Sequence, residues 1–163
     1  MRATEVVKHI FKINKNIDGN SIDNLKLNEL LYRVQGQALA EYGVQAFEDP
    51  IVALKHGPVV ATVYSEYSRF KKEAISEDRA PDNNVDVKII FAVCDVLMFN
   101  NEKSGIALSR ESKKHENPWY VSFNEYNGKT ISLDSIKDFF SKPENKIPSF
   151  AEKIKDMDNQ TLG

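Results

Sequence analysis

The sequence has few of the residues that build disulfide bonds and metal sites. It contains one cysteine, Cys94, and three histidines, His9, His56 and His115, that lie far apart. One cysteine cannot form an internal disulfide, and these spacings do not match the paired ligands of a zinc site. Because a free cysteine in an apolar run is usually buried, we expect Cys94 to be a buried thiol. We expect no metal ion and no other cofactor.

Signatures of nucleotide binding, membrane insertion and secretion are also missing. The sequence has no Gly-x-Gly-x-x-Gly motif and no complete phosphate loop of the form Gly-x-x-x-x-Gly-Lys-Ser/Thr, so a nucleotide cofactor has no support. Its longest apolar run, residues 85–99, is interrupted by charged residues and is shorter than the about 20 residues of a membrane-spanning helix. The N-terminus lacks the basic and then apolar layout of a secretory signal. We therefore expect a cytoplasmic protein without a membrane segment.

Neither sign of charge is in large excess. Lysine and arginine total 22 and aspartate and glutamate total 24, so the formal net charge is −2. This balance gives no bulk attraction to nucleic acid or to an anionic membrane, although a local basic patch is compatible with it. With 163 residues and 41% hydrophobic content, the chain is long enough for one domain with an ordinary core.

A long amphipathic helix is predicted to end at about residue 42. Ser21 or Asp23 can cap its start, and Gly43 suits the left-handed conformation that ends many helices. Its apolar residues recur at steps of three and four, which predicts that one face packs against the core. These residues are Leu27, Leu30, Leu31, Val34, Ala38 and Tyr42.

A sharp turn is predicted at Gly57 and Pro58. Glycine can adopt backbone angles that other residues avoid, and proline suits the first turn of a helix. We therefore expect an extended segment, residues 50–54, followed by a helix over residues 58–72. Its apolar stripe consists of Val60, Val63, Tyr64, Tyr67 and Phe70.

The rest of the chain is also mostly helical in pattern. Residues 85–89 alternate between apolar and polar, so a short strand there competes with the helical interpretation. Asn127-Gly128 predicts a small β-hairpin between residues 120–123 and residues 129–131. The predicted fold class is thus α-rich α+β, a compact helical domain with a short extended segment before Gly57 and a small β-hairpin after Trp119. The further predicted helices cover residues 4–13, 85–99, 102–112 and 132–142.

We assign residues 1–142 to this domain and residues 143–163 to a C-terminal tail. Ser149 and Glu152 form a capping-box pattern at the start of a last helical segment. Ile154 and Met157 share one side of it, so the tail either docks as a helix or frays.

Catalysis has one candidate, His115 beside Glu116. A histidine oriented by a carboxylate can act as a general base, but neighbours in sequence rarely face one another, and no nucleophile stands at a recognisable spacing. The alternative is that His115 satisfies backbone carbonyls at a helix end while Pro118 and Trp119 pin the chain to the core. We favour this alternative and expect no enzyme activity.

Two tyrosines are candidate contacts with a protein partner. Tyrosine is frequent at protein interfaces because its stiff ring buries a large area at small entropic cost. Tyr32 lies on the opposite side of its helix from Leu30 and Val34, and Tyr126 lies beside the predicted hairpin turn. Core packing explains most of the other aromatic residues.

Two blocks of residues, in a fixed order, form a recognisable signature. The first block contains Lys26, Leu27, Leu31, Tyr32, Gly36, Ala53, Gly57, Pro58, Val59 and Tyr64, and the second contains His115, Pro118 and Trp119. Together they resemble the signature of the Panacea antitoxin domain, the SocA-like family of phage-associated proteins. The resemblance covers residues 4–140, and it departs at Leu54, where tryptophan is common, and at Asn28, where glutamine is usual.

This resemblance implies an antitoxin of a bacterial or phage toxin–antitoxin pair. Proteins of the family neutralise many unrelated toxins, generally by direct protein contact, and some relatives present the toxin to a AAA+ protease such as ClpXP. The implied partners are therefore a cognate toxin and, in the second case, such a protease. The motif residues are then mainly structural, and they build the core behind a toxin-binding surface.

The two helices on either side of residue 50 also allow a DNA-binding interpretation. A helix-turn-helix has a compact turn of about three or four residues, whereas residues 43–57 join the helices here. A winged-helix variant tolerates a longer connection, with the hairpin at Asn127-Gly128 as its wing. A winged-helix-like DNA-binding regulator is the alternative function, but we do not expect nucleic acid to be the main partner.

Overall fold

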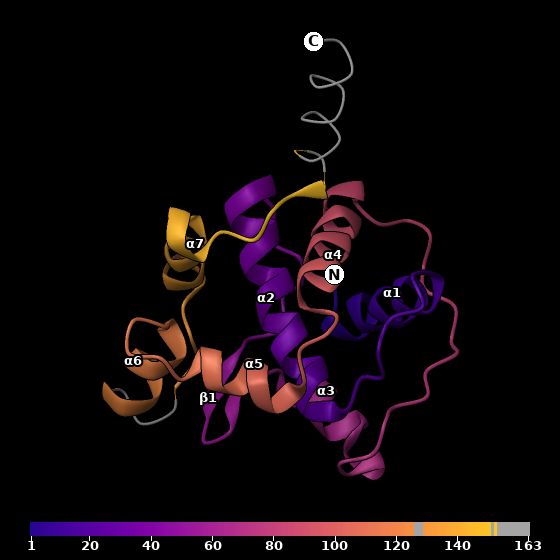
Figure 1. Cartoon of the computed structure of the whole chain (residues 1–163), viewed down its shortest axis with the longest axis horizontal. Coiled ribbons are helices and arrows are strands. Elements are labelled where there is room, and N and C mark those ends of the chain that lie inside the picture. Colours follow the sequence, from indigo (N-terminus) through magenta and orange to yellow (C-terminus); the bar gives the residue numbers. More distant parts are fainter. Residues whose placement is uncertain (126–128, 151, 153–163) are drawn as a thin grey trace.

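The computed structural model describes residues 1–125, 129–150 and 152 of the chain. In this part helices dominate, beside one small antiparallel sheet, which confirms the α-rich α+β class (Figure 1). None of the helices described is both long enough and apolar enough to cross a membrane. The elements in chain order are α1 (Ala3–Asn16), α2 (Asn24–Tyr42), β1 (Val52–Leu54), β2 (Gly57–Val59), α3 (Ala61–Glu66), the 3-10 helix η1 (Ser68–Phe70), α4 (Val87–Asn100), α5 (Gly105–Ser112), α6 (Pro118–Glu125), α7 (Leu133–Ser141) and the 3-10 helix η2 (Pro143–Asn145).

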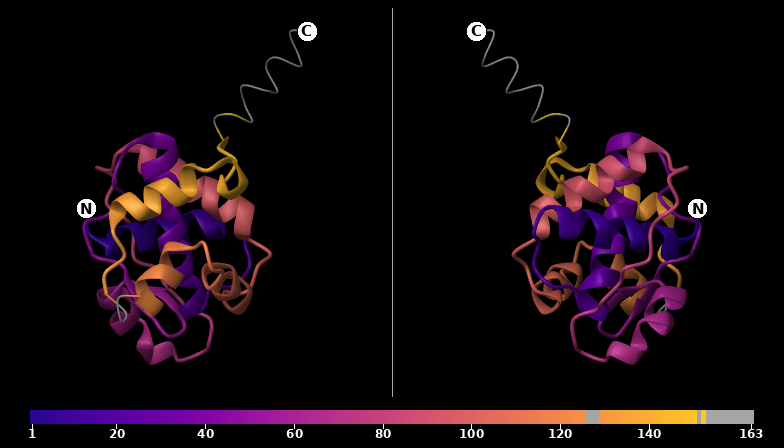
Figure 2. Two further views of the ribbon diagram at one scale, coloured as in Figure 1. Left: turned by 90° about the vertical axis from the view of Figure 1, so that its left-hand side faces the viewer. Right: turned by 90° about the vertical axis from the view of Figure 1, so that its right-hand side faces the viewer.

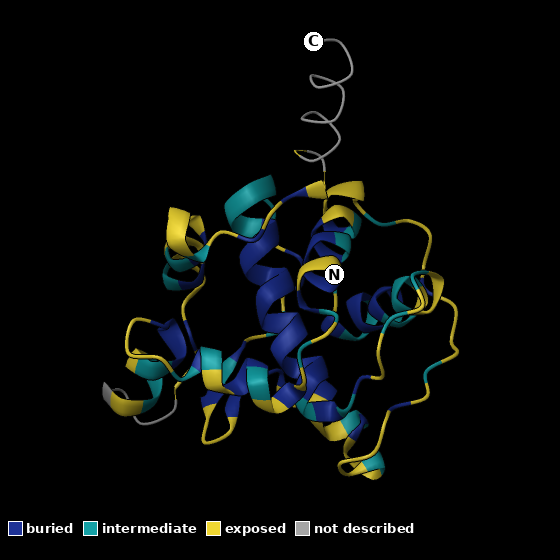
Figure 3. Cartoon of the chain, viewed as in Figure 1, coloured by how far each residue is buried: buried dark blue, intermediate teal, exposed yellow. Residues whose placement is uncertain are grey.

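Helix α2 is the centre of the fold, and the other helices are arranged around it (Figure 1 and Figure 2). It begins where the Asp23 carboxylate accepts the backbone N–H of Lys26 at 2.8 Å, and it ends at Gly43, whose φ of 66° is left-handed. These positions confirm Asp23 as the cap and Gly43 as the terminator. Every residue from Lys26 to Ala38 is buried, so these turns of α2 have no solvent face (Figure 3).

Helix α7 packs closely against α2 at Gly36. A Cβ atom built on Gly36 would lie 2.1 Å from the ring of Phe140, so only glycine leaves room for that ring. The Phe140 ring also meets Tyr32 edge to face, with 5.5 Å between the ring centroids. A glycine on one helix and two aromatic rings therefore set the distance between α2 and α7.

The turn at Gly57 belongs to a β-hairpin and not to the start of a helix. Strand β1, which confirms the extended segment before Gly57, pairs with β2 so that Leu54 lies opposite Gly57. Pro58 is therefore inside β2, and the helix predicted over residues 58–72 is confined to α3 and η1. Proline is tolerated because β2 lies at the edge of the sheet, where one missing N–H donor breaks no ladder.

Residues 120–123 are part of helix α6 and do not form a strand. The hairpin predicted after Trp119 is therefore wrong in its first arm, and the winged-helix interpretation loses its wing. In this helical form, the apolar and aromatic residues of the segment pack against β1 and α5. The turn of that hairpin, Asn127-Gly128, and the candidate contact Tyr126 lie outside the described residues.

The predicted second arm of that hairpin is extended, but it pairs with β1. Thr130 forms a bridge with Val52, and the Ile131 N–H donates to the Ile51 carbonyl at 2.8 Å. The segment after α6 thus lies beside β1 as a short third segment of the sheet.

The remaining predicted helices are confirmed with shifted bounds. Helix α1 covers Ala3–Asn16, so it begins one residue before the predicted start and ends three residues after the predicted end. Helix α4 forms over residues 87–100, so the competing strand at its start is not formed. Serine hydroxyls cap α5 and α7, where Ser104 and Ser132 each accept a backbone N–H three residues further on.

The segment after α7 lies along α2 and α4. The Gln37 amide on α2 donates to the Ile147 carbonyl at 3.2 Å. The Phe150 N–H donates to the Asp95 carboxylate of α4 at 2.6 Å. These two bonds tie the chain end that follows α7 to the central helices.

Of the two hydrogen bonds of a capping box, the described residues of the C-terminal tail form the one that the serine accepts. The Ser149 hydroxyl accepts the backbone N–H of Glu152 at 3.0 Å. Ile154 and Met157 lie outside the described residues.

An ion-pair cluster holds the loop after η1 against α3. The Tyr67 hydroxyl donates to Glu77 at 2.5 Å, and the Arg79 guanidinium donates to Glu77 and to Glu66. The hydrogen bond from Arg79, joined by that from Tyr67, lowers the pKa of Glu77 to about 2. The Glu77 side chain is almost fully buried whereas Arg79 is half exposed, so solvent screens part of their attraction.

Replacing Glu77 by glutamine is expected to reduce stability at neutral pH and to flatten its dependence on acid pH. Because the folded pKa lies below the ordinary value of 4.5, the carboxylate contributes stability above pH 4.5 that is lost as the pH falls toward 2. We expect a difference of about 1–2 kcal/mol in the free energy of unfolding at neutral pH. Urea unfolding at a series of pH values should show the two proteins converging in acid, and a constant difference would contradict this account.

Candidate functional site

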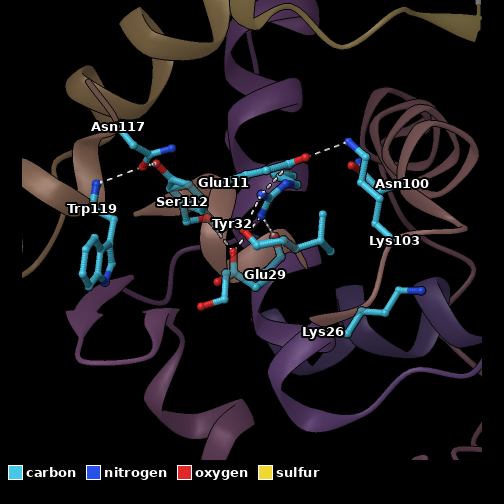
Figure 4. A network of polar contacts seen from close by, with 12 residues as sticks. Lys26, Glu29, Tyr32, Asn100, Lys103, Glu111, Ser112, Asn117 and Trp119 are labelled. Carbon is cyan, nitrogen blue, oxygen red and sulfur yellow. Dashed lines mark hydrogen bonds and ion pairs between the residues drawn. The ribbon is translucent and has the colours of Figure 1, made fainter. Parts of the chain in front are cut away.

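An ion pair in the middle of α2 joins this helix to α5 (Figure 4). The Arg33 guanidinium donates to the Glu29 carboxylate at 2.7 Å, and both side chains are buried. The same guanidinium donates to the Leu108 carbonyl at 3.0 Å and lies 3.2 Å from Glu111. The Ser112 hydroxyl donates to Glu29 at 2.6 Å. These are charge-assisted hydrogen bonds, which are the stronger kind and fix the two helices relative to each other.

One oxygen of Glu29 has no hydrogen-bond partner among the described residues. This atom, Oε1, is enclosed, and a Cβ atom built on Gly57 of β2 would lie 2.3 Å from it. Burial raises the pKa of Glu29, while the charge of Arg33 and the hydrogen bond from Ser112 oppose this shift. Position 57 therefore needs glycine for two reasons. Its φ is +142°, and the Glu29 carboxylate occupies the space that a side chain would fill.

The hairpin turn before Gly57 is held from two sides. The Ser109 hydroxyl of α5 donates to the His56 carbonyl at 2.6 Å. The Trp119 indole N–H of α6 donates to the Leu54 carbonyl at 2.7 Å. The two sequence blocks thus meet in space at this turn, since Gly57 belongs to the first block and Trp119 to the second.

Tyr32 is a core residue and not a surface contact. Its side chain is 1% exposed, and its hydroxyl donates to the side-chain oxygen of Asn117 at 2.7 Å. Burial raises the pKa of this hydroxyl, so it stays protonated. The expectation that Tyr32 faces a partner is wrong because α2 is buried on every side at this point.

Among the other motif residues, most are buried and two are exposed. Tyr64 is exposed on α3, although the sequence predicted it within an apolar stripe. His115 is exposed and stacks on Tyr120, with 4.3 Å between the ring centroids. Lys26 is buried, which lowers its pKa, and its ammonium donates to the Asn101 carbonyl. The remaining buried motif residues are Leu27, Leu31, Gly36, Ala53, Gly57, Pro58, Val59, Pro118 and Trp119.

Cys94 lies on α4 and is half-buried, less than the sequence predicted. Burial raises the pKa of its thiol, so the thiol is protonated and a poor nucleophile near neutral pH. In the described ranges, no three histidine, cysteine, aspartate or glutamate side chains are grouped closely enough to hold a metal ion.

A groove of about 250 Å³ lies between the end of α4, α5 and the segment that follows α7. Its buried side chains come from Arg33, Asn100 and Asn117, together with Phe140 and Ile147. Its half-buried and exposed side chains are those of Phe99, Lys103, Glu111, Lys114, Phe139, Glu144, Asn145 and Lys146. Arg33 therefore links the buried ion pair of α2 to the surface of the molecule.

Helix α4 exposes a stripe of apolar side chains. Val87, Phe91 and Met98 are all exposed, and steps of four and seven residues place them on one face of the helix. Phe99 follows at the end of the helix and also lines the groove. Clustered exposed apolar side chains mark interaction surfaces more often than isolated ones do, so this stripe and the groove are the candidate binding site.

The sequence analysis missed Glu29, Arg33 and the groove. The spacing of Glu29 and Arg33, four residues apart, is visible in the sequence, but helix ion pairs with this spacing are usually solvated. Asn100 and Asn117 carry no distinguishing pattern at all. Only the burial of α2 shows that these polar residues form one connected site.

Replacing Gly57 by valine is expected to lower the free energy of unfolding by about 2–5 kcal/mol. The new side chain meets Glu29 and requires a φ that β-branched residues avoid. Urea unfolding measures the loss. Gly43→Val is the control, because it places the same side chain at another positive φ where no other atom lies within 4 Å of a built Cβ. Equal losses in the two variants would contradict the role of Glu29.

Replacing Tyr32 by phenylalanine is expected to destabilise the domain by about 1–2 kcal/mol. The change removes the bond to Asn117 and leaves the side-chain oxygen of Asn117 with one donor, the Trp119 backbone N–H, in place of two. Thermal unfolding measures the shift in Tm. A variant as stable as the parent would mean that Asn117 finds another partner.

The sequence of the chain also matches a known protein family. The family model described as "Antitoxin SocA-like, Panacea domain" matches residues 27–162, which include most of the central helix, the hairpin turn and the groove. No curated protein and no solved structure gives a match to the chain. The match extends over far more than half of the sequence and contains both blocks of the signature except Lys26. The chain therefore belongs to the family of SocA-like antitoxins that share the Panacea domain.

Proposed function

We propose that this protein is the antitoxin of a toxin–antitoxin pair and that it neutralises its toxin by direct binding, without catalysis. The observation that carries the proposal is the family match over residues 27–162. A binding role needs a stable scaffold and an exposed surface that a partner can cover. Both features are present in the described part of the chain.

The exposed stripe of α4 is the surface that we propose the toxin contacts. The stripe runs from Val87 to Met98, and eleven helical steps correspond to about 16 Å. A standard protein interface buries about 800 Å² on each partner, and its centre is apolar. The stripe is suited to form such a centre, with Phe99 and the groove beside it.

Helix α4 is held firmly enough to present a preformed surface. Asp95, on the inner side of α4, accepts hydrogen bonds from Gln37 at 3.0 Å and from Tyr42 at 2.6 Å. It also accepts the Phe150 N–H. A surface fixed in this way loses little conformational entropy on binding, which favours tight association.

The first experiment expresses the neighbouring reading frame with and without this chain and measures growth. We expect the neighbour to arrest growth alone and this chain to restore it. The double variant Phe91→Gln, Met98→Gln should bind the neighbour's product about tenfold more weakly or worse, because interface anchors contribute more than 1 kcal/mol each. Isothermal titration calorimetry or surface plasmon resonance measures the affinity.

The matched control is Ile106→Gln, since Ile106 is as exposed on α5 as Met98 is on α4. It should bind like the parent. Because Phe91 also packs against Tyr42, with 6.0 Å between the ring centroids, thermal unfolding must show that each variant is folded at the temperature of the binding assay. A harmless neighbour would contradict the antitoxin function. Rescue that disappears in a host without ClpXP would contradict direct occlusion, because binding alone requires no protease.

A further inference from the structure

A polar pocket lies where the N-terminal ends of α2 and α5 meet. Its volume is about 380 Å³, and the loop after η1 forms its third side. A Cβ atom built on Gly105 would lie 2.8 Å from the backbone nitrogen of Lys26 and 3.0 Å from the Asp23 carboxylate, so the two helix ends are in direct contact. The lining residues are Asn20, Ser21, Asp23, Lys26, Lys72, Ala74, Glu102, Lys103, Ser104 and Gly105.

Lys26 brings a buried positive charge to this pocket. The residue is 4% exposed, and its ammonium has no ion-pair partner in the described part of the chain. It donates one hydrogen bond, to the Asn101 carbonyl at 3.0 Å, and has two further N–H groups to donate. Figure 4 shows its side chain pointing away from Glu29. Because a buried charge without a counter-charge is costly, an anion in the pocket would stabilise this ammonium.

The start of α5 adds backbone donors to the same pocket. The Ala107 N–H is bonded to the Ser104 hydroxyl at 3.0 Å, whereas the N–H groups of Gly105 and Ile106 donate to no atom of the described residues. Free N–H groups at a helix N-terminus bind anions, and the helix dipole favours negative charge there. The ammonium of Lys26 is bonded to Asn101, in the connection that leads into α5, so both kinds of donor serve one pocket.

The other charges of the pocket leave Lys26 without a counter-charge. Asp23 is held at the start of α2, where its carboxylate accepts the Lys26 backbone N–H at 2.8 Å. The Lys103 ammonium lies 3.0 Å from a carboxylate of α5 and is neutralised by it. Lys72 and Glu102 are both exposed, so solvent screens them, and their charges are opposite. The buried ammonium and the two helix ends therefore favour an anion.

We propose that this pocket binds a phosphate group of a small molecule. The phosphate oxygens accept from the Lys26 ammonium and from the N–H groups at the start of α5, and Lys72 approaches from the exposed side. A phosphate has more acceptor oxygens than a carboxylate, which suits donors that come from three segments of the chain. The volume of the pocket lies within the about 300–1,000 Å³ that is usual for small-molecule sites. The α4 stripe contributes no residue, so the proposal is independent of the antitoxin function.

Inorganic phosphate is the probe that tests the pocket. Titration of the isotope-labelled protein at constant ionic strength, followed by NMR, should give saturable shifts of the Gly105 and Ile106 backbone amides. We expect a Kd on the order of 1 mM, which is within the binding energy that so small an ion can supply. Acetate should bind about tenfold more weakly, because it has fewer oxygens and a smaller charge. Absence of saturable shifts, saturable shifts only elsewhere in the chain, or equal binding of acetate would each overturn the proposal.

Lysine variants identify the groups that hold the anion. Lys72→Gln should weaken phosphate binding several-fold, whereas Lys71→Gln should bind like the parent, since Lys71 is also exposed but does not line the pocket. Phosphate should raise the Tm of the parent, because it binds the folded state, and this rise should be lost in Lys26→Gln. A rise that persists in Lys26→Gln, or equal weakening in the Lys71 and Lys72 variants, would refute the site. If Lys26→Gln does not fold, the comparison of Lys72→Gln with Lys71→Gln decides.

Discussion

The structure depends on the complete burial of the middle of α2. A helix without a solvent face must bond its polar side chains inside the protein, since an unpaired buried charge costs several kcal/mol. The polar residues of α2 therefore bond to one another and to several neighbouring elements. Glu29 and Arg33 bind α5, and Gln35 binds the backbone of residues 46 and 47 at the end of the loop after α2. These bonds hold the surrounding elements in one arrangement, which leaves Oε1 of Glu29 without a partner among the described residues.

This constraint explains why distant parts of the signature are close in space. The turn before Gly57 approaches the Glu29 carboxylate, and only a residue without a side chain fits there. Trp119 closes the same turn from α6, and Tyr32 reaches the chain just before α6 through Asn117. The first and second blocks are thus two halves of one core. Their spacing in the sequence follows from the lengths of the elements that lie between them.

The sequence predicted the parts of the fold that depend on local chemistry. The caps at Asp23 and Gly43, the extended segment before Gly57 and most helices follow from side chains acting on their own backbone. The errors come from tertiary context. A helical spacing of leucines indicates one buried face, and it does not show that the opposite face, with Tyr32, is buried as well. Residues 120–123 have strand-like composition, yet they form a helix that packs against β1 and α5. The groove is lined by residues of α2, α4, α5 and α7, which are far apart in the sequence.

The separation between the buried network and the α4 stripe has a consequence for binding. The stripe residues Val87, Phe91 and Met98 form none of the polar bonds that hold α2, so their side chains can change without breaking the core. One scaffold can in this way present different apolar surfaces. Asn100 and Arg33 are different, because they belong to the core and also line the groove. A partner that enters the groove therefore contacts atoms whose positions the core fixes, so a substitution at either residue changes the stability of the fold together with the shape of the groove.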